Sequence, residues 1–147
     1  MTKFTDLALS PKILKAVEAA GYETPTPIQA GAIPPALEGR DVLGIAQTGT
    51  GKTASFTLPM IHLLARGRAR ARMPRSLVLC PTRELARQVA HEIRRLARAL
   101  PNTNVVTICG GEPIRHQQVA LENGVDVVVG TPGRVLDHIG RETLDLT

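Results

Sequence analysis

The residues best suited to chemistry lie in one short loop, residues 46–53. Its glycines, Gly49 and Gly51, allow φ > 0 and close backbone approach, and the pattern predicts a helix that begins near Gly51. Backbone N–H groups at such a helix start point toward an anion. Lys52 adds a positive charge for the β- and γ-phosphates, and the Thr53 hydroxyl is placed to bind Mg²⁺. The pattern therefore predicts a nucleoside triphosphate site formed by Ala46, Gln47, Thr48, Gly49, Thr50, Gly51, Lys52 and Thr53.

The segments on either side of this loop should position it. The apolar run Val42 to Ile45 predicts a strand that leads into the loop, and a helix should follow it to about Leu64. The usual phosphate-loop pattern has Gly where this chain has Ala46. An ordinary Gly/Thr-rich turn at a helix start is therefore the alternative interpretation. The predicted buried positions of the helix are Phe56, Leu58, Ile61 and Leu64.

Two helices are predicted before the loop. Ser10-Pro11 is typical of a helix start, and that helix should end at Gly21. Thr26-Pro27 should open a second helix, with Gln29 in its first turn and an interruption at Pro34-Pro35.

Tyr22 and Gln29 together suggest recognition of a base. An aromatic ring can pack on a base, and a carboxamide can both donate to and accept from adenine. The alternative is a core tyrosine and an unrelated surface glutamine, which the nearby phosphate loop disfavours.

The rest of the chain alternates strands with helices. The β-rich runs are residues 77–80, 105–109 and 127–129, and helical patterns follow each of them. This order predicts an α/β fold with a mostly parallel sheet and helices on both faces. The carboxyl ends of parallel strands meet at one edge, where ligands bind. With the strand expected at residues 42–45, four strand ends should meet there.

The turns at these strand ends carry arginines and glycines. Thr82 should cap a helix whose first turn holds Arg83, and an anion bound there would explain a basic residue at the positive end of the helix dipole. Glu84 beside it offers the simpler alternative, that the two charges offset each other. The predicted phosphate-backbone contacts are Pro81, Thr82, Arg83, Glu84, Gly110, Gly111, Thr131, Pro132, Gly133 and Arg134.

Composition is compatible with an anionic partner. The 147 residues include 18 basic and 13 acidic side chains, and 14 of the basic ones are arginines, which suit forked phosphate contacts. Aromatic residues are only 2 % of the chain, so platforms for stacking bases are scarce and any grip on nucleic acid should use phosphate and sugar. The arginine-rich stretch 66–75 is expected to be an exposed loop, either a nucleic-acid contact or simply solvated.

The cysteines and the hydropathy suggest a soluble protein of the reducing cytoplasm. Cys80 and Cys109 are far apart in sequence and lack neighbouring metal ligands, so we expect buried free thiols. No apolar run is long enough to span a bilayer, so no membrane partner is expected.

These motifs, in this order and spacing, resemble the DEAD-box RNA helicase family over the whole chain. In that family the position of Ala46 normally holds alanine, and the flanking sequence is most similar to bacterial members. The motifs that carry the resemblance are Phe4, residues 21–29, residues 46–53, residues 81–86, Gly110-Gly111 and residues 131–134.

The resemblance implies a RecA-like P-loop domain that binds ATP or ADP, Mg²⁺ and RNA. It implies a base-recognition segment at residues 1–30 and an ATP-binding domain at residues 31–147. Gln29, Tyr22 and the backbone near Thr24 would select adenine, with Phe4 in support, while Lys52 and Thr53 would hold phosphates and Mg²⁺. The turns at the strand ends would grip the RNA backbone.

Hydrolysis needs groups that we do not find. None of the strands ends in an Asp that could bind Mg²⁺, and the family's Asp-Glu-Ala-Asp segment and second RecA-like domain are missing from these 147 residues. We therefore expect the N-terminal part of a longer helicase, inactive by itself. The alternatives are a stand-alone nucleotide or RNA binder without turnover, and a P-loop kinase or GTPase with no adenine preference.

Overall fold

The computed structural model describes residues 3–46, 51–66, 74–99 and 103–145. The chain forms two compact units: Met1–Gly67 with Glu92–Pro101, and Arg68–His91 with Asn102–Thr147. Helix α4 (Arg83–Leu96) begins in the second unit and ends in the first.

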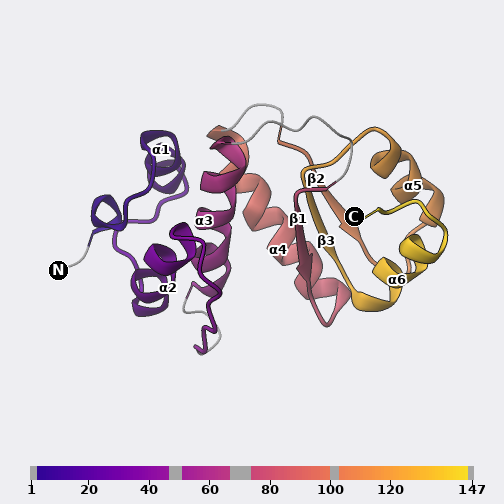
Figure 1. Cartoon of the computed structure of the whole chain (residues 1–147), viewed down its shortest axis with the longest axis horizontal. Helices are drawn as coiled ribbons and strands as arrows, with labels where there is room; N and C mark the ends of the chain where they lie inside the picture. Colours follow the sequence, from indigo (N-terminus) through magenta and orange to yellow (C-terminus); the bar gives the residue numbers. More distant parts are fainter. Residues whose placement is uncertain (1–2, 47–50, 67–73, 100–102, 146–147) are drawn as a thin grey trace. The chain divides into compact units, whose positions relative to one another are not determined.

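The first unit is helical, and its helices begin where the sequence predicts. A 3-10 helix, η1 (Phe4–Leu7), precedes α1 (Pro11–Ala19), α2 (Pro27–Leu37) and α3 (Lys52–Arg66) (Figure 1). Ser10 and Thr26 are the N-cap residues of α1 and α2, and a proline follows each of them because its missing N–H costs nothing there. The core joins the apolar faces of these helices to the end of α4 through Leu7, Ile13, Val17, Ile33, Leu58, Ile61 and Leu96.

Three sequence-based predictions in this unit are wrong. Pro34 and Pro35 do not interrupt α2, which continues to Leu37 and is capped by Glu38. Although each proline removes one helix hydrogen bond, Ile33 is fully buried in the core, and that packing holds the turn in place. Phe56 of α3 is 40 % exposed rather than buried, since it lies off the face that carries Leu58 and Ile61.

The strand expected at residues 42–45 is also absent. Residues 41–46 are irregular, and Leu43 and Ile45 are 89 % and 85 % exposed. An isolated four-residue strand has no stability without a neighbour to complete its hydrogen bonds, and none of the described strands pairs with this segment. Within the part of the chain that the structure describes, the ends of three strands rather than four therefore meet at one edge.

The second unit contains the parallel sheet. Its strands are β1 (Ser76–Leu79), β2 (Val105–Ile108) and β3 (Val127–Gly130), in the order β1-β3-β2. The register pairs Leu77 with Val128 and Val106 with Val128, so β3 is the central strand. All three strands lie within one or two residues of the runs that the sequence predicts.

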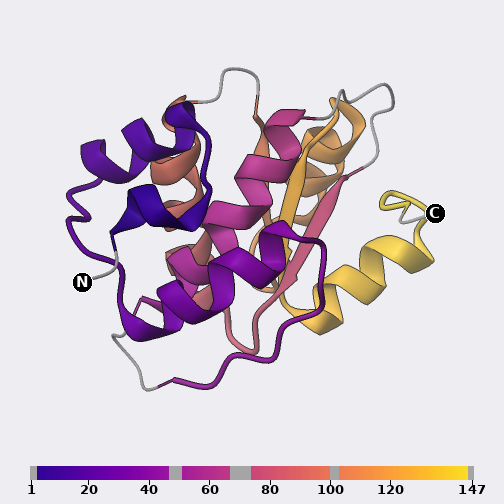
Figure 2. The same ribbon diagram turned by 60° about the vertical axis from the view of Figure 1, so that its left-hand side comes forward.

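Helices cover both faces of this sheet, as the sequence predicts. Right-handed connections place α4 and α5 (Ile114–Glu122) on opposite faces, because the chain reverses direction across the sheet between them. In Figures 1 and 2, α5 and α6 (Pro132–Gly140) lie on the face away from α4. Leu121, Val128 and Val135 pack together on that side.

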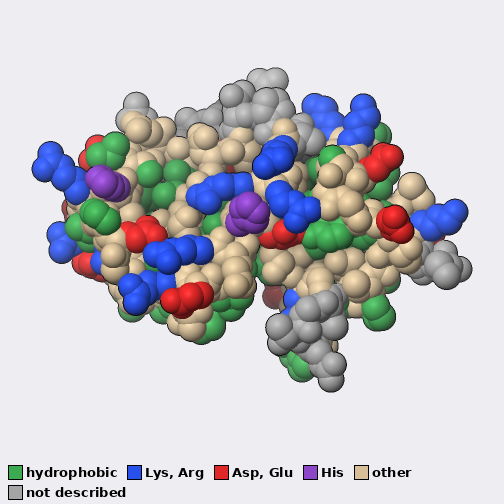
Figure 3. Space-filling model, turned by 180° about the vertical axis from the view of Figure 1, so that it is seen from behind, with side chains coloured by type: hydrophobic (Ala, Val, Ile, Leu, Met, Phe, Trp, Pro, Cys, Tyr) green, Lys and Arg blue, Asp and Glu red, His purple; other side chains and the backbone are tan. Residues whose placement is uncertain are grey.

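Charge is mixed on the surface. Figure 3 shows Lys and Arg side chains beside Asp and Glu side chains, so the two signs of charge are interspersed on the face that it presents. No helix in the described part of the chain is long and apolar enough to cross a membrane.

Candidate nucleotide and RNA sites

The last glycine of the predicted phosphate loop, Gly51, has the left-handed backbone conformation that glycine allows. Gly51 has φ = 82°, a value that L side chains rarely adopt, and α3 begins at the next residue, Lys52. The Lys52 side chain is exposed and Thr53 is half-buried, both in the first turn, where N–H groups lack helical partners. Of the other loop residues, Ala46 is irregular and half-buried, and Gln47, Thr48, Gly49 and Thr50 lie outside the described residues.

Gln29 joins the start of α2 to this loop. Its Oε1 accepts from the Thr26 backbone N–H at 2.9 Å, and its Nε2 donates to the Gly51 carbonyl at 3.2 Å. The Gln29 N–H donates to Thr26 Oγ1, which completes a capping box. A Cβ at position 51 would overlap the carboxamide. The Gln29 side chain is 2 % exposed, and it links the start of α2 to the phosphate loop. Each polar atom of its carboxamide can still form one more hydrogen bond.

Phe4 and Tyr22 form an aromatic pair in the same unit. Their ring centroids are 6.4 Å apart with a 39° tilt, and the Tyr22 hydroxyl donates to the Glu92 carboxylate. A pocket of about 570 Å³ lies against this pair and includes Thr24 in its lining. Three residues predicted to support the base thus line one pocket. Gln29 is not among its lining residues.

The second unit places the predicted backbone contacts at the sheet edge. A cleft of about 620 Å³ opens where the three strands end and the helices α4 and α6 begin. Nine of the ten predicted residues line it: Pro81, Thr82, Arg83, Glu84, Gly110, Gly111, Thr131, Gly133 and Arg134. Pro132 lies beside them as the first residue of α6.

Both helix starts at this edge follow the predicted pattern, with one difference. Thr82 caps α4, because its Oγ1 accepts from the Leu85 N–H at 3.2 Å. Thr131 occupies the N-cap position of α6, but its hydroxyl makes no capping hydrogen bond. Leu85, in the first turn of α4, is exposed at the surface.

Arg83 reaches across the cleft to the glycine pair. Its Nη1 donates to the Gly110 carbonyl at 3.2 Å. Gly111 has φ = 81°, and a Cβ there would overlap the guanidinium of Arg83. The glycine pair therefore gives Arg83 room to approach the backbone.

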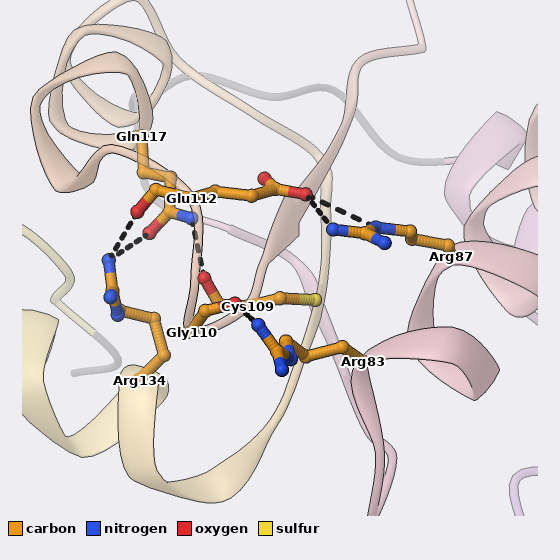
Figure 4. Close-up of polar contacts among 7 residues, drawn as sticks. All are labelled: Arg83, Arg87, Cys109, Gly110, Glu112, Gln117 and Arg134. Carbon is orange, nitrogen blue, oxygen red and sulfur yellow. Dashed lines mark hydrogen bonds and ion pairs between the residues drawn. The ribbon is translucent and has the colours of Figure 1, made fainter.

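Glu112 holds the β2–α5 turn from two sides, a role that the sequence did not reveal. Its carboxylate accepts from Arg87 Nε and Nη2 at 3.2 and 3.0 Å, and its carbonyl accepts from Arg134 Nη1 at 3.2 Å (Figure 4). These contacts cross-link the turn to α4 and α6. A glutamate directly after two glycines was the one available signal.

Gln117 and His138 form a buried polar pair behind the cleft, and the sequence did not reveal this pair either. Gln117 Nε2 donates to the Cys109 carbonyl at 3.0 Å, and Gln117 Oε1 lies 2.8 Å from His138 Nε2. Burial, with the nearby charge of Arg134, lowers the pKa of His138 from its ordinary value of 6.5. Both effects favour the neutral imidazole.

The two cysteines are buried free thiols, as expected. Burial raises the pKa of both, and the Glu112 carboxylate adds to the effect at Cys109. Among the described residues, no group of three or more His, Cys, Asp and Glu side chains could hold a metal ion. A nucleotide-bound Mg²⁺ does not need such a group, because phosphates supply part of its shell.

Comparison with solved structures defines the class of protein as a RecA-like helicase domain. The RNA helicase Prp28 from Chaetomium thermophilum, solved with ADP bound, matches with a TM-score of 0.91 and 41 % identity over 100 % of this chain and 36 % of that one. A DEAD box protein from Methanococcus jannaschii matches with a TM-score of 0.89 and 44 % identity, over 99 % of this chain and 39 % of that one.

The chain belongs to the DEAD/DEAH box helicase family, whose model matches residues 26–147. ATP-dependent RNA helicase DeaD from Klebsiella pneumoniae is 51 % identical over 99 % of this chain, and its namesake from Mycobacterium tuberculosis strain CDC 1551 is 49 % identical over 98 %. The chain spans only 22 % and 25 % of those relatives. Family membership removes the P-loop kinase or GTPase alternative.

Proposed function

We propose that this chain binds an adenine nucleotide, as ATP or ADP with Mg²⁺, and holds the sugar-phosphate backbone of RNA. Residues 1–30 would recognise the base, and residues 31–147 would form the ATP-binding part of an ATP-dependent RNA helicase. Two relatives carry that activity in their names, and one solved neighbour contains ADP.

The observation that carries this proposal is the hydrogen bond from Gln29 Nε2 to the Gly51 carbonyl. It ties the residue that would read adenine to the last glycine of the loop that would hold the phosphates. A base bound at Gln29 would therefore fix the position of the phosphate loop. Tyr22 and Phe4 would supply the apolar surface for the base, beside the backbone near Thr24.

Lys52 and Thr53 would hold the phosphates and Mg²⁺. Both residues fit, since they occupy the first turn of α3 directly after a glycine whose φ only glycine adopts readily. When bound, Mg²⁺ neutralises charge on the β- and γ-phosphates. Lys52 would add its charge to the same groups, and the Thr53 hydroxyl would be an Mg²⁺ ligand.

The sheet-edge cleft would hold RNA through its backbone. Two arginines, two helix starts and a glycine pair border the cleft, and its described lining residues include no aromatic side chain on which a base could stack. Helix starts and guanidinium groups both favour phosphate. RNA binding in this cleft would thus be independent of the RNA sequence.

Hydrolysis and unwinding would need a Walker-B-type acid and the second RecA-like domain of a longer chain. A nucleotide- and RNA-binding module without turnover is the second candidate. The reducing cytoplasm is the proposed compartment, in line with the two free thiols.

Calorimetric titration with Mg-ADP and Mg-GDP tests the base-reading role of Gln29. We expect ADP to bind more tightly, and Gln29→Ala to weaken ADP binding by about 1–3 kcal/mol, the size of a bidentate base contact. Gln88→Ala, at an exposed glutamine of α4, is the matched control and should change neither affinity.

The ratio of the two affinities separates recognition from structural damage. Loss of the hydrogen bond between Gln29 and Gly51 alone would weaken the binding of ADP and of GDP equally, since both nucleotides carry the same phosphates. Equal binding of ADP and GDP by the unmodified chain would overturn adenine recognition.

A further inference from the structure

Arg134 is held by two acceptors behind the sheet edge. Its Nη1 donates to the Glu112 carbonyl at 3.2 Å and to Gln117 Oε1 at 3.4 Å. Figure 4 shows both contacts on one side of the guanidinium. Arg134 is half-buried and also lines the cleft, so its remaining N–H groups are available to a ligand there.

Gln117 is itself fixed by its other contacts. The side chain is buried, its Nε2 donates to the Cys109 carbonyl at 3.0 Å, and its Oε1 faces His138 Nε2 at 2.8 Å. Turning the amide over would place its NH₂ against the guanidinium of Arg134, which has only donors. The carboxamide therefore has one consistent orientation, with Oε1 toward Arg134.

His138 completes this arrangement. Because Gln117 Oε1 can only accept, His138 Nε2 must carry a proton and donate. Nδ1, as the unprotonated nitrogen, can accept from the Thr143 hydroxyl at 2.7 Å, and the same hydroxyl also lies 3.1 Å from the His138 carbonyl oxygen. The ring is fully buried, so the surroundings hold it in place. A chain of hydrogen bonds thus runs from Thr143 through His138 and Gln117 to Arg134.

We propose that Gln117 is a positioning residue for RNA binding: oriented by His138 and anchored on the Cys109 carbonyl, its Oε1 holds the Arg134 guanidinium ready for a backbone phosphate. The proposal rests on the RNA role proposed for the cleft. It assigns a task to a residue outside the motifs that led to that role. A guanidinium held in advance loses less rotational freedom when phosphate binds.

The first test needs no RNA. NMR measures how fast the Arg134 guanidinium rotates about its Nε–Cζ bond in the unmodified chain and in Gln117→Met, which keeps the size but removes the acceptor. We expect rotation about tenfold faster in Gln117→Met, since tenfold corresponds to about 1.4 kcal/mol, the size of one such hydrogen bond.

Gln117→Glu separates positioning from a merely structural role. The glutamate keeps an acceptor for Arg134 but cannot donate to the Cys109 carbonyl. Its carboxylate is the stronger acceptor for a guanidinium, so positioning predicts rotation at least as slow as in the unmodified chain, even without the Cys109 contact. If Gln117→Glu rotates as fast as Gln117→Met, or if neither variant changes the rate, the proposal is overturned. If Gln117→Met does not fold, the rotation rate in Gln117→Glu can still overturn the proposal, because faster rotation than in the unmodified chain contradicts it.

The second test uses a single-stranded oligouridylate over a series of salt concentrations. Each phosphate contact on a single strand contributes about 0.7 to the slope of log K against log salt. We expect Gln117→Met to reduce the slope by up to about 0.7, toward the value for Arg134→Gln, and to have no further effect in the Arg134→Gln background. Gln118→Ala, one residue along α5 and about 100° around it, is the matched control.

The two tests fail separately. If Arg134→Gln changes neither affinity nor slope, the RNA role of Arg134 is wrong, and the rotation rates still decide whether Gln117 positions it. If Gln117→Met reduces the slope of log K against log salt as much in the Arg134→Gln background as it does alone, Gln117 does not act through Arg134. That result would overturn the positioning role.

Discussion

Single residues set the geometry of the proposed nucleotide site, and Gly51 does so through its backbone. With φ = 82°, it lets its own carbonyl face Gln29 at the point where α3 begins. A side chain at this position would meet both the left-handed strain and the carboxamide.

Gly51→Ala should therefore lower the free energy of unfolding by roughly 1–2 kcal/mol, from the left-handed conformation alone, and weaken Mg-ADP binding. Gly31→Ala is its control, because Gly31 lies inside α2 with open space around its Cα, and alanine there should raise stability by about 0.5–1 kcal/mol. Urea unfolding and calorimetry measure both effects. A Gly51→Ala chain that keeps wild-type stability would contradict the strain assigned to this position.

His138 should make stability depend on pH. Burial and the charges of Arg134 and Arg141 lower its pKa below 6.5, against a smaller opposite effect of Asp137. Between that lowered pKa and 6.5, the unfolded chain binds a proton that the folded chain does not. The unfolding free energy should thus fall as pH drops below 6.5, by at most about 1.4 kcal/mol per pH unit for this one proton.

Urea unfolding from pH 7.5 to 5.5 measures this slope. His138→Gln should be less stable at pH 7.5, because the buried chain of hydrogen bonds is disturbed, but its slope should be shallower. His116→Gln, at an exposed histidine of α5, is the control. Identical slopes for the unmodified chain and His138→Gln would assign the pH dependence to other groups.

At the scale of elements, α3 connects the proposed nucleotide site to the core of the first unit. Its first turn carries Lys52 and Thr53, and its buried face carries Leu58 and Ile61. Since helix starts can hold phosphates only when the helix itself is fixed, this buried face supports the site.

Ile61→Ala should lower the free energy of unfolding by about 2–5 kcal/mol, because Ile61 is fully buried and a cavity would remain. Phe56→Ala should lower the free energy of unfolding by only about 1–2 kcal/mol, since much of the Phe56 ring already lies in solvent. Thermal and urea unfolding of the two variants give the comparison. Equal losses would mean that Phe56 packs as the sequence pattern predicted.

The proline pair in α2 illustrates how elements depend on their packing. Local rules end a helix at Pro34, yet α2 continues because Ile33 is anchored in the core that it shares with α3. Long-range contacts outweigh two missing hydrogen bonds here.

For the whole molecule, stability should be distributed unevenly. Strand β3 lies between β1 and β2, and Val127, Val128 and Val129 are fully buried. Residues 42–45 have no ladder partner among the described strands.

Amide hydrogen exchange should therefore be slowest in β3 within the second unit and fast at residues 42–45. Local opening needs only a few broken contacts at an exposed segment, whereas a central strand opens with its unit. Exchange measured by NMR residue by residue tests this. Slow exchange at residues 42–45, comparable to β3, would mean that the segment pairs as a strand after all.

The sequence by itself determined the local features. The helix starts at Ser10-Pro11, Thr26-Pro27 and Thr131-Pro132 each have a proline as the first helical residue, and Thr26 adds a capping hydrogen bond, so these local features could be predicted. The parallel sheet, and the edge at which its strands end, followed from three β-rich runs that alternate with helices, since parallel strands must end on one side.

Only the tertiary structure decided which side chains meet. Nothing local distinguishes Gln117 or His138, because they lie 21 positions apart and become partners only when α5 and α6 pack on one face of the sheet. The same holds for Glu112 with Arg87, and for the missing strand at residues 42–45. Each depends on whether a distant group is present, and a pattern read along the chain carries no information about distance in space.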